Sequence, residues 1–213
     1  MNLSPSPLGL EKCSSRLRRG LGNPCVQVRS CSTLLVGVLV ASLCVIHPTI
    51  SSAQSQVDEY RLKAAFLFHF AQFVEWPTEA LGNADAPFVI CIAGEDPFRG
   101  GLEETVQGKL IASRPVQIRH IKQVQEGQEC RVLFIGKSER EGVSPLTATL
   151  RNMPVLTVGE SDDFLQKAGI IRFCVEDRKI RFEVNQEAAE TANLKISSRL
   201  LLLAKTVVGR KGR

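Results

Sequence analysis

Polar residues follow three predicted strands directly after a glycine, and these residues are the best placed to bind a small ligand. The three segments are Gly94-Glu95-Asp96, Gly136-Lys137-Ser138 and Gly159-Glu160-Ser161. The carboxyl ends of parallel strands share one edge of an α/β sheet, where ligands usually bind. This pattern predicts a possible ligand crevice formed by Glu95, Asp96, Lys137 and Ser138. Helix capping by Asp96 and Ser161 explains the same residues without a ligand.

Catalytic and cofactor-binding motifs are poorly supported. Gly136-Lys137-Ser138 resembles the end of a phosphate-binding loop, but Arg131 stands where that loop needs a glycine. No G-x-G-x-x-G motif follows the first strand and no G-x-S-x-G motif occurs in the chain, which argues against a dinucleotide cofactor and a serine hydrolase. Glu103-Glu104 is typical of a solvated helix face. We therefore predict that the protein is not an enzyme and carries no cofactor.

Metal binding is also not expected from the sequence. After residue 53 the histidines are His69 and His120, which are far apart in the sequence and have no nominated partners. The cysteines in the same part of the chain are Cys91, Cys130 and Cys174, without a C-x-x-C motif. This pattern excludes a zinc knuckle or a thioredoxin-type site. In an oxidising compartment, two of these three cysteines can pair and one is left over.

Residues 1–53 have the organisation of a secretory signal peptide. They carry five basic residues against Glu11, which accounts for +4 of the formal net charge of +5, and then an apolar run from Cys31 to Ile46. Ser51 and Ala53 supply small residues at positions −3 and −1 of a cleavage site. We therefore expect export to the periplasm and no membrane span after cleavage. An uncleaved N-terminal anchor is the alternative.

The remaining chain, 54–213, is predicted to be a single domain of alternating helices and strands. It has a net charge of only +1, so it lacks the clustered basic face that a nucleic-acid partner requires. Apolar runs predict strands at 88–93, 116–121, 131–135 and 154–158, a hairpin at 170–184, and helices at 56–75, 97–107, 139–152, 161–169 and 186–208. This order predicts an α/β fold with a mostly parallel sheet flanked by helices, Rossmann-like, ending in a β-hairpin and a long terminal helix.

The two longest predicted helices, 56–75 and 186–208, are apolar around most of their circumference. One sheet face cannot cover such a helix, so part of the apolar surface is expected to contact a second protein. The predicted partner or dimer surface comprises Phe66, Phe70, Phe73, Leu201 and Leu202. Burial of both helices on two sides within the monomer is the alternative.

Several separated segments resemble one family, in the same sequence order. The longest is EYRLKAAFLFHFAQFVEWP at 59–77, and the others lie at 90–98, 114–115, 132–138, 154–158, 180–185 and 194–201. These segments are similar to those of the YfiR family of periplasmic proteins. The resemblance implies a dimeric, non-enzymatic regulator that binds the periplasmic sensor domain of an inner-membrane diguanylate cyclase and restrains synthesis of cyclic di-GMP. It also implies a Cys91–Cys130 disulfide, and leaves Cys174 without the partner that some members provide.

Two other functions remain open from the sequence. One is a periplasmic small-molecule-binding protein or enzyme that uses the strand-end crevice. The other is a regulator of a different membrane receptor, such as a sensor kinase, which would need the same exported scaffold with apolar helices.

Overall fold

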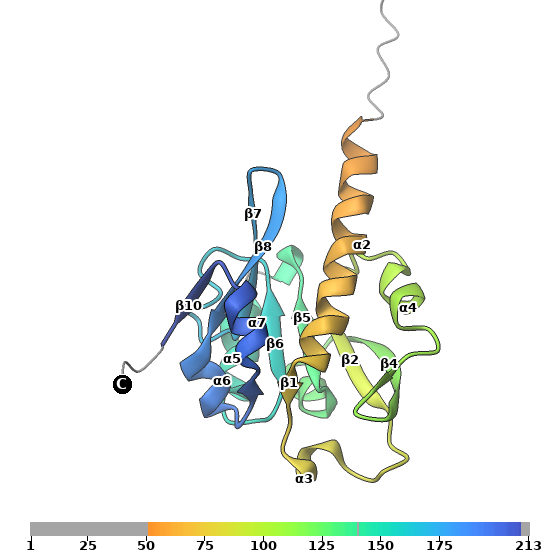
Figure 1. Ribbon diagram of the computed structural model, residues 1–213, viewed down its shortest axis with the longest axis vertical. Helices are drawn as coiled ribbons and strands as arrows, with labels where there is room; N and C mark the ends of the chain where they lie inside the picture. Colours follow the sequence, from red (N-terminus) through yellow and green to blue (C-terminus); the bar gives the residue numbers. More distant parts are fainter. Residues whose placement is uncertain (1–50, 140, 210–213) are drawn as a thin grey trace, which may run out of the picture. The chain divides into compact units, whose positions relative to one another are not determined.

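The computed structural model describes residues 51–139 and 141–209 (Figure 1). The predicted signal peptide therefore lies almost wholly outside the described residues. Within the described ranges, no helix combines the length and the apolar character that crossing a bilayer requires.

The described chain alternates helices and strands. The helices are α2 (Ser51–Gln72), α3 (Thr78–Leu81), α4 (Gly101–Val106), α5 (Val143–Leu150), α6 (Gln186–Thr191) and α7 (Ser198–Leu203), with 3₁₀ turns η1 (Val124–Glu129) and η2 (Lys137–Glu139). The strands are β1 (Val74–Glu75), β2 (Phe88–Ala93), β3 (Leu110–Ile111), β4 (Arg114–Ile121), β5 (Val132–Ile135), β6 (Leu156–Gly159), β7 (Ile171–Glu176), β8 (Lys179–Asn185), β9 (Lys195–Ile196) and β10 (Thr206–Val208).

Eight strands form one mixed sheet in the order β10-β8-β7-β6-β5-β2-β4-β3. The central strands β4, β2, β5, β6 and β7 are parallel, whereas β7 and β8 form an antiparallel hairpin. A short antiparallel pair, β1 with β9, stands apart from this sheet. The architecture confirms the predicted α/β fold with a mostly parallel sheet.

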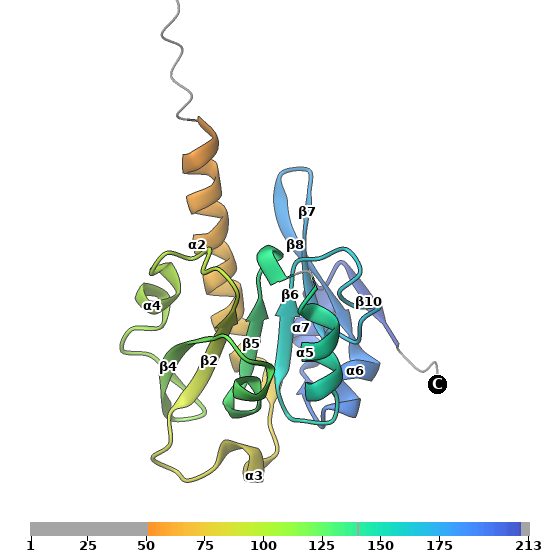
Figure 2. The same cartoon turned by 180° about the vertical axis from the view of Figure 1, so that it is seen from behind.

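Each face of the sheet carries its own apolar core. Figure 1 shows α2 in front of the strands, and Figure 2 shows α5 on the opposite side. Alternate residues of β2 explain the division, since Ile90 and Ile92 pack in the core with α2 while Val89 and Cys91 pack in the core with α5. The fully buried pattern of β2 follows from this covering on both faces.

The prediction of one long helix over 186–208 is wrong. This segment contains α6, β9, α7 and β10. Asn185 accepts a hydrogen bond from the Ala188 N–H and caps α6, and Asn193 beyond its end adopts a left-handed φ of 56°. Ser197 then caps α7 by accepting from the Leu200 N–H. The two caps divide the segment because each satisfies free backbone groups at a new helix start.

Other predicted helices are shorter than expected. The structure has α4 only from Gly101, since the Asp96 carboxylate accepts a hydrogen bond from the Phe98 N–H at 2.8 Å in a turn that precedes the helix. Residues 161–169 form turns rather than the predicted helix, and the helix expected over 139–152 is limited to α5. A small polar side chain that bonds to nearby backbone, as Asp96 does before α4, favours a turn over a helix.

Candidate functional site

A cavity of about 370 Å³ lies where β2 and β5 end. All four residues of the predicted crevice line it, namely Glu95, Asp96, Lys137 and Ser138. Helix α2 contributes further wall residues, Gln56, Val57, Tyr60 and Arg61, and α4 contributes Gly101 and Glu104. The structure therefore brings together the polar residues that follow β2 and β5. It also places residues of α2 and α4 in the wall, which the sequence analysis did not predict.

Close backbone approach shapes this cavity. Gly94 has a φ of 85°, and a Cβ atom there would lie 2.6 Å from the Ser138 Oγ. The Glu95 N–H donates a hydrogen bond to the same Oγ at 3.1 Å. Gly94 is thus required both for its left-handed conformation and for the approach of the loop after β2 to the loop after β5.

The cavity lining carries charges of both signs. The wall includes three cations, Arg61, Arg99 and Lys137, and the carboxylates of Glu95, Asp96 and Glu104. A polyphosphate would need a mainly cationic or amide-lined cradle, which this wall does not resemble. A small polar molecule with both a cationic and an anionic group matches the lining better.

A buried ionic network lies at the end of β6, where the sequence analysis noted Gly159-Glu160-Ser161. The Lys63 ammonium forms ion pairs with Glu160 and Glu59, and the Lys63 and Glu160 side chains are each only 2% exposed. The Tyr60 hydroxyl donates to Glu160 Oε2 at 3.1 Å, and the Lys63 Nζ lies 4.4 Å from the centre of the Tyr60 ring. Burial, together with the Glu160 charge, raises the pKa of Tyr60 above its ordinary value, so the phenol stays protonated and keeps its donor role. The network attaches α2 to the end of β6.

Sequence reasoning missed this network. The Lys63 and Glu160 residues are 97 positions apart, and only the packing of α2 on the sheet brings them together. One signal was available, because Lys63 falls within an otherwise apolar stretch of α2, between Leu62 and Ala64. A charged residue in such a stretch is rarely buried without a partner.

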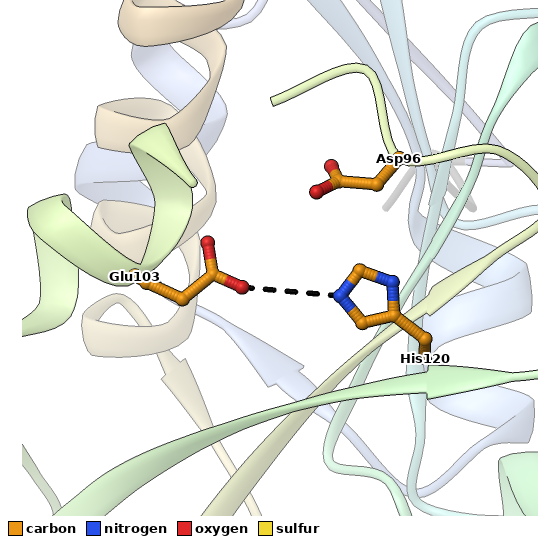
Figure 3. Close-up of side chains that lie close together, drawn as sticks. All are labelled: Asp96, Glu103 and His120. Carbon is orange, nitrogen blue, oxygen red and sulfur yellow. Dashed lines mark ion pairs between the residues drawn. The ribbon is translucent and has the colours of Figure 1, made fainter. Parts of the chain in front are cut away.

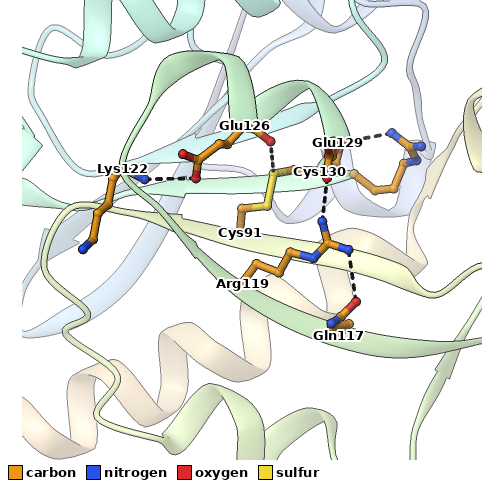
Figure 4. Close-up of a disulfide and its surroundings, with 8 residues drawn as sticks. Cys91, Gln117, Arg119, Lys122, Glu126, Glu129 and Cys130 are labelled. Atoms are coloured by element: carbon orange, nitrogen blue, oxygen red, sulfur yellow. Dashed lines mark hydrogen bonds and ion pairs between the residues drawn. A yellow bond between two sulfur atoms is a disulfide. The ribbon is translucent and has the colours of Figure 1, made fainter.

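A disulfide joins Cys91 of β2 to Cys130, the residue two before β5, with a Cα–Cα distance of 5.8 Å (Figure 4). Both cysteines are fully buried. The surrounding polar contacts hold the connecting segment in place, since Arg119 pairs with Glu129 at 2.6 Å and the Lys122 N–H donates to Glu126 at 3.3 Å. The pairing matches the one that the family resemblance implies.

The third cysteine, Cys174 on β7, is a partly buried free thiol. Burial and the neighbouring Glu183 carboxylate raise the pKa of the Cys174 thiol. Because the thiolate is the reactive form, this environment disfavours redox chemistry at Cys174 at neutral pH.

The residues of the predicted partner surface separate into core and surface. Phe70 is fully buried between Phe173 and Phe182, so its assignment to an interaction surface is corrected to the core. Phe66, Phe73 and Leu201 are partly buried and pack against that core. Leu202 is 84% exposed, and its neighbour Leu203, which the sequence prediction did not include, is 67% exposed. The exposed apolar part of the predicted surface is therefore on α7.

Comparison with known proteins identifies the family. No curated protein matches the sequence. Two solved structures resemble it weakly. The first is a conserved domain protein from Vibrio cholerae O1 biovar El Tor strain N16961, with a TM-score of 0.44 and 8% identity over 56% of this chain and 54% of that chain. The second is the ABC domain in complex with L-Trp from Streptococcus pneumoniae, with a TM-score of 0.43 and 10% identity over 56% of this chain and 55% of that chain. The chain thus spans about half the length of these two proteins. A family model described as YfiR/HmsC-like matches residues 60–205, which include residues 60–72 of α2, the disulfide and α7, and the chain therefore belongs to the YfiR/HmsC-like family, a family of periplasmic regulatory proteins.

Proposed function

We propose that this protein binds the periplasmic domain of an inner-membrane diguanylate cyclase and inhibits it, which lowers cyclic di-GMP. The observation that carries the proposal is the family match over residues 60–205, because regulation of diguanylate cyclases is the role associated with this family in general. We further propose that the protein is exported to the periplasm and forms a homodimer.

The exposed end of α7 supports a protein partner. Leu202 and Leu203 place large apolar side chains in solvent, although burying one leucine side chain contributes about 1.5–3 kcal/mol. The helix is held firmly, since Ser197 caps it and the Ser197 N–H donates to the Phe73 carbonyl at 2.9 Å. A fixed helix that exposes adjacent leucines suits contact with an apolar partner surface. We assign Leu202 as the main contact, with Leu201, Phe66 and Phe73 supporting it from the core side.

Capture from membranes tests the identity of the partner. The tagged protein is recovered from detergent-solubilised membranes, and co-purifying proteins are identified by mass spectrometry. We expect a diguanylate cyclase with a periplasmic domain. Recovery of a sensor kinase in its place would contradict the cyclase proposal and support the alternative receptor.

Substitution of Leu202 by Asp should weaken the captured complex by about 10–100-fold, the equivalent of losing one buried leucine. Leu110→Asp is the matched control, because Leu110 is a 57% exposed leucine on β3, at the opposite edge of the sheet from β10. The affinities are measured by titration against the solubilised cyclase. If both variants lower the affinity for the cyclase equally, or if neither lowers it, Leu202 is not part of the interface.

Binding of a small molecule is the second candidate function. The cavity at the ends of β2 and β5 favours it, because it is large enough for a small metabolite and its lining includes charges of both signs. Native mass spectrometry of protein isolated from the periplasm distinguishes the two functions. A retained small molecule that is lost in Lys137→Ala would support ligand binding.

A further inference from the structure

Three potential metal ligands, one of which lines the cavity, come together in the structure, although the sequence suggested that the histidines were too scattered for a metal site. They are Asp96, Glu103 and His120, and one ligand atom from each lies within 4.8 Å of the others. Figure 3 shows the two carboxylates and the imidazole pointing toward a common space. The sequence did not nominate Asp96 and Glu103 as partners of His120, because only the fold brings these carboxylates to it.

The strand register explains this arrangement. Strand β4 pairs with β2 in parallel, with His120 opposite Ile92. Side chains alternate along β4, so His120 is on the same face as Ile118, which packs against the core beneath α2 and α4. Asp96 follows β2 by three residues, and α4 places Glu103 in its first turn. Three separate elements thus contribute one ligand each.

The distances suit a single small cation. The His120 Nε2 lies 3.9 Å from the Glu103 Oε1. Bonds from zinc to nitrogen and oxygen ligands are about 2.0–2.2 Å long, so ligand atoms around one ion are about 3–4 Å apart. Small side-chain rotations would therefore bring the three atoms into coordination distance. The imidazole argues for a transition metal, since calcium and magnesium prefer oxygen ligands alone.

The charges and the exposure favour the same conclusion. Within the described residues, neither Asp96 nor Glu103 forms an ion pair with lysine or arginine, and the Glu103 pair with His120 needs a protonated imidazole. A divalent cation would neutralise both carboxylates and bind the neutral imidazole. The His120 and Glu103 side chains are 50% and 45% exposed, so solvent ions can reach them and water can complete the coordination.

We propose that Asp96, Glu103 and His120 form a binding site for a divalent transition-metal ion, with Zn²⁺ as the best-matched ion. The site is independent of the cyclase-binding proposal. Asp96 also lines the cavity, and Glu103 neighbours its wall residue Glu104. Bound metal would therefore fasten the loop after β2 and helix α4 to β4, and fix one wall of the cavity.

Zinc titration tests the proposal directly. The protein is purified without a histidine tag, treated with a chelator and titrated with ZnCl₂ by isothermal calorimetry. We expect one ion per chain. Because even outer-shell substitutions cost about 10–100-fold in metal affinity, His120→Ala should weaken binding by at least about tenfold. His69→Ala is the matched control, since His69 is an exposed histidine on α2, and it should bind zinc like the wild type.

Two further variants keep the result interpretable. Glu103→Gln changes an exposed helix residue, so the fold should be retained while zinc affinity falls by at least about tenfold. Cys174→Ser should have no effect, which excludes the free thiol as the ligand. Circular dichroism confirms that each variant is folded. Absence of zinc binding by the wild type, or unchanged affinity in both His120→Ala and Glu103→Gln, would overturn the proposal, whatever the result of the cyclase experiments.

Discussion

Replacing Lys63 with methionine should lower the free energy of unfolding by about 3–5 kcal/mol, the usual cost of breaking a buried ion pair from one side. The side chain keeps its length and apolar stem, but the Glu160 carboxylate loses its cation while it remains 2% exposed. The Tyr60 hydroxyl alone cannot compensate that charge. Urea denaturation measures the change, and an unaltered slope with denaturant concentration shows that the two end states are unchanged.

Two comparisons isolate the buried pair. Lys63→Met combined with Glu160→Gln removes both charges, so the double variant should be more stable than Lys63→Met alone. Lys167→Met is the control, because Lys167 pairs with Asp163, four residues earlier, and the two side chains are 30% and 47% exposed rather than buried. Its stability should be close to that of the wild type. A loss below about 1 kcal/mol in Lys63→Met would show that the Lys63–Glu160 pair is no stronger than a surface salt bridge.

Removal of the disulfide through Cys91→Ala and Cys130→Ala should lower the free energy of unfolding by about 3–4 kcal/mol, because the bridge closes a sequence separation of 39 residues and restricts the unfolded chain. Alanine fits both sites, which are fully buried and apolar on the side packed against α5. Thermal and urea unfolding of the double variant against the wild type measures the loss.

The oxidation state provides an internal check on this prediction. A reductant should destabilise the wild type to the level of the double variant and leave the double variant unchanged. Cys174→Ala should keep the response of the wild type, since that thiol is free. If the reductant has no effect on the wild type, or if mass mapping finds both thiols free, the disulfide is absent from the protein in solution.

The buried strands could be predicted closely from the sequence. Continuous apolar runs ending in glycine placed β2 at 88–93 and β5 at 131–135, where the structure has Phe88–Ala93 and Val132–Ile135. The hairpin of β7 and β8 was equally clear, because alternating apolar residues flank Glu176-Asp177-Arg178, and Asp177 and Arg178 adopt the left-handed φ values of 50° and 60° that a tight turn requires. Local sequence determines these elements.

The C-terminal region could not be predicted in this way. Apolar residues from Ala189 to Val207 fit one helix by spacing, but β9 pairs with β1 and β10 pairs with β8, and both partners come from elsewhere in the chain. The caps at Asn185 and Ser197 were the local signals against a continuous helix. Spacing alone favours a single helix, and the tertiary pairing of β9 and β10 overrides that local preference.

The candidate site shows the same division between local and distant information. The polar residues after β2 and β5 were identified because each follows its own strand. The packing of α2 on the sheet brings Lys63 to Glu160. The register of β4 against β2 brings His120 close to Asp96. Contacts of this kind depend on the finished fold, so no window of sequence contains them.

The central claim is that the protein restrains a diguanylate cyclase, and cyclic di-GMP measured in a deletion strain tests it most directly. Quantification by mass spectrometry should show a raised nucleotide level and increased biofilm matrix after deletion. Expression of the wild type or of Leu110→Asp should restore the original level, whereas Leu202→Asp should fail although the protein is folded and exported. An unchanged or lowered cyclic di-GMP level in the deletion strain would contradict the proposed inhibition.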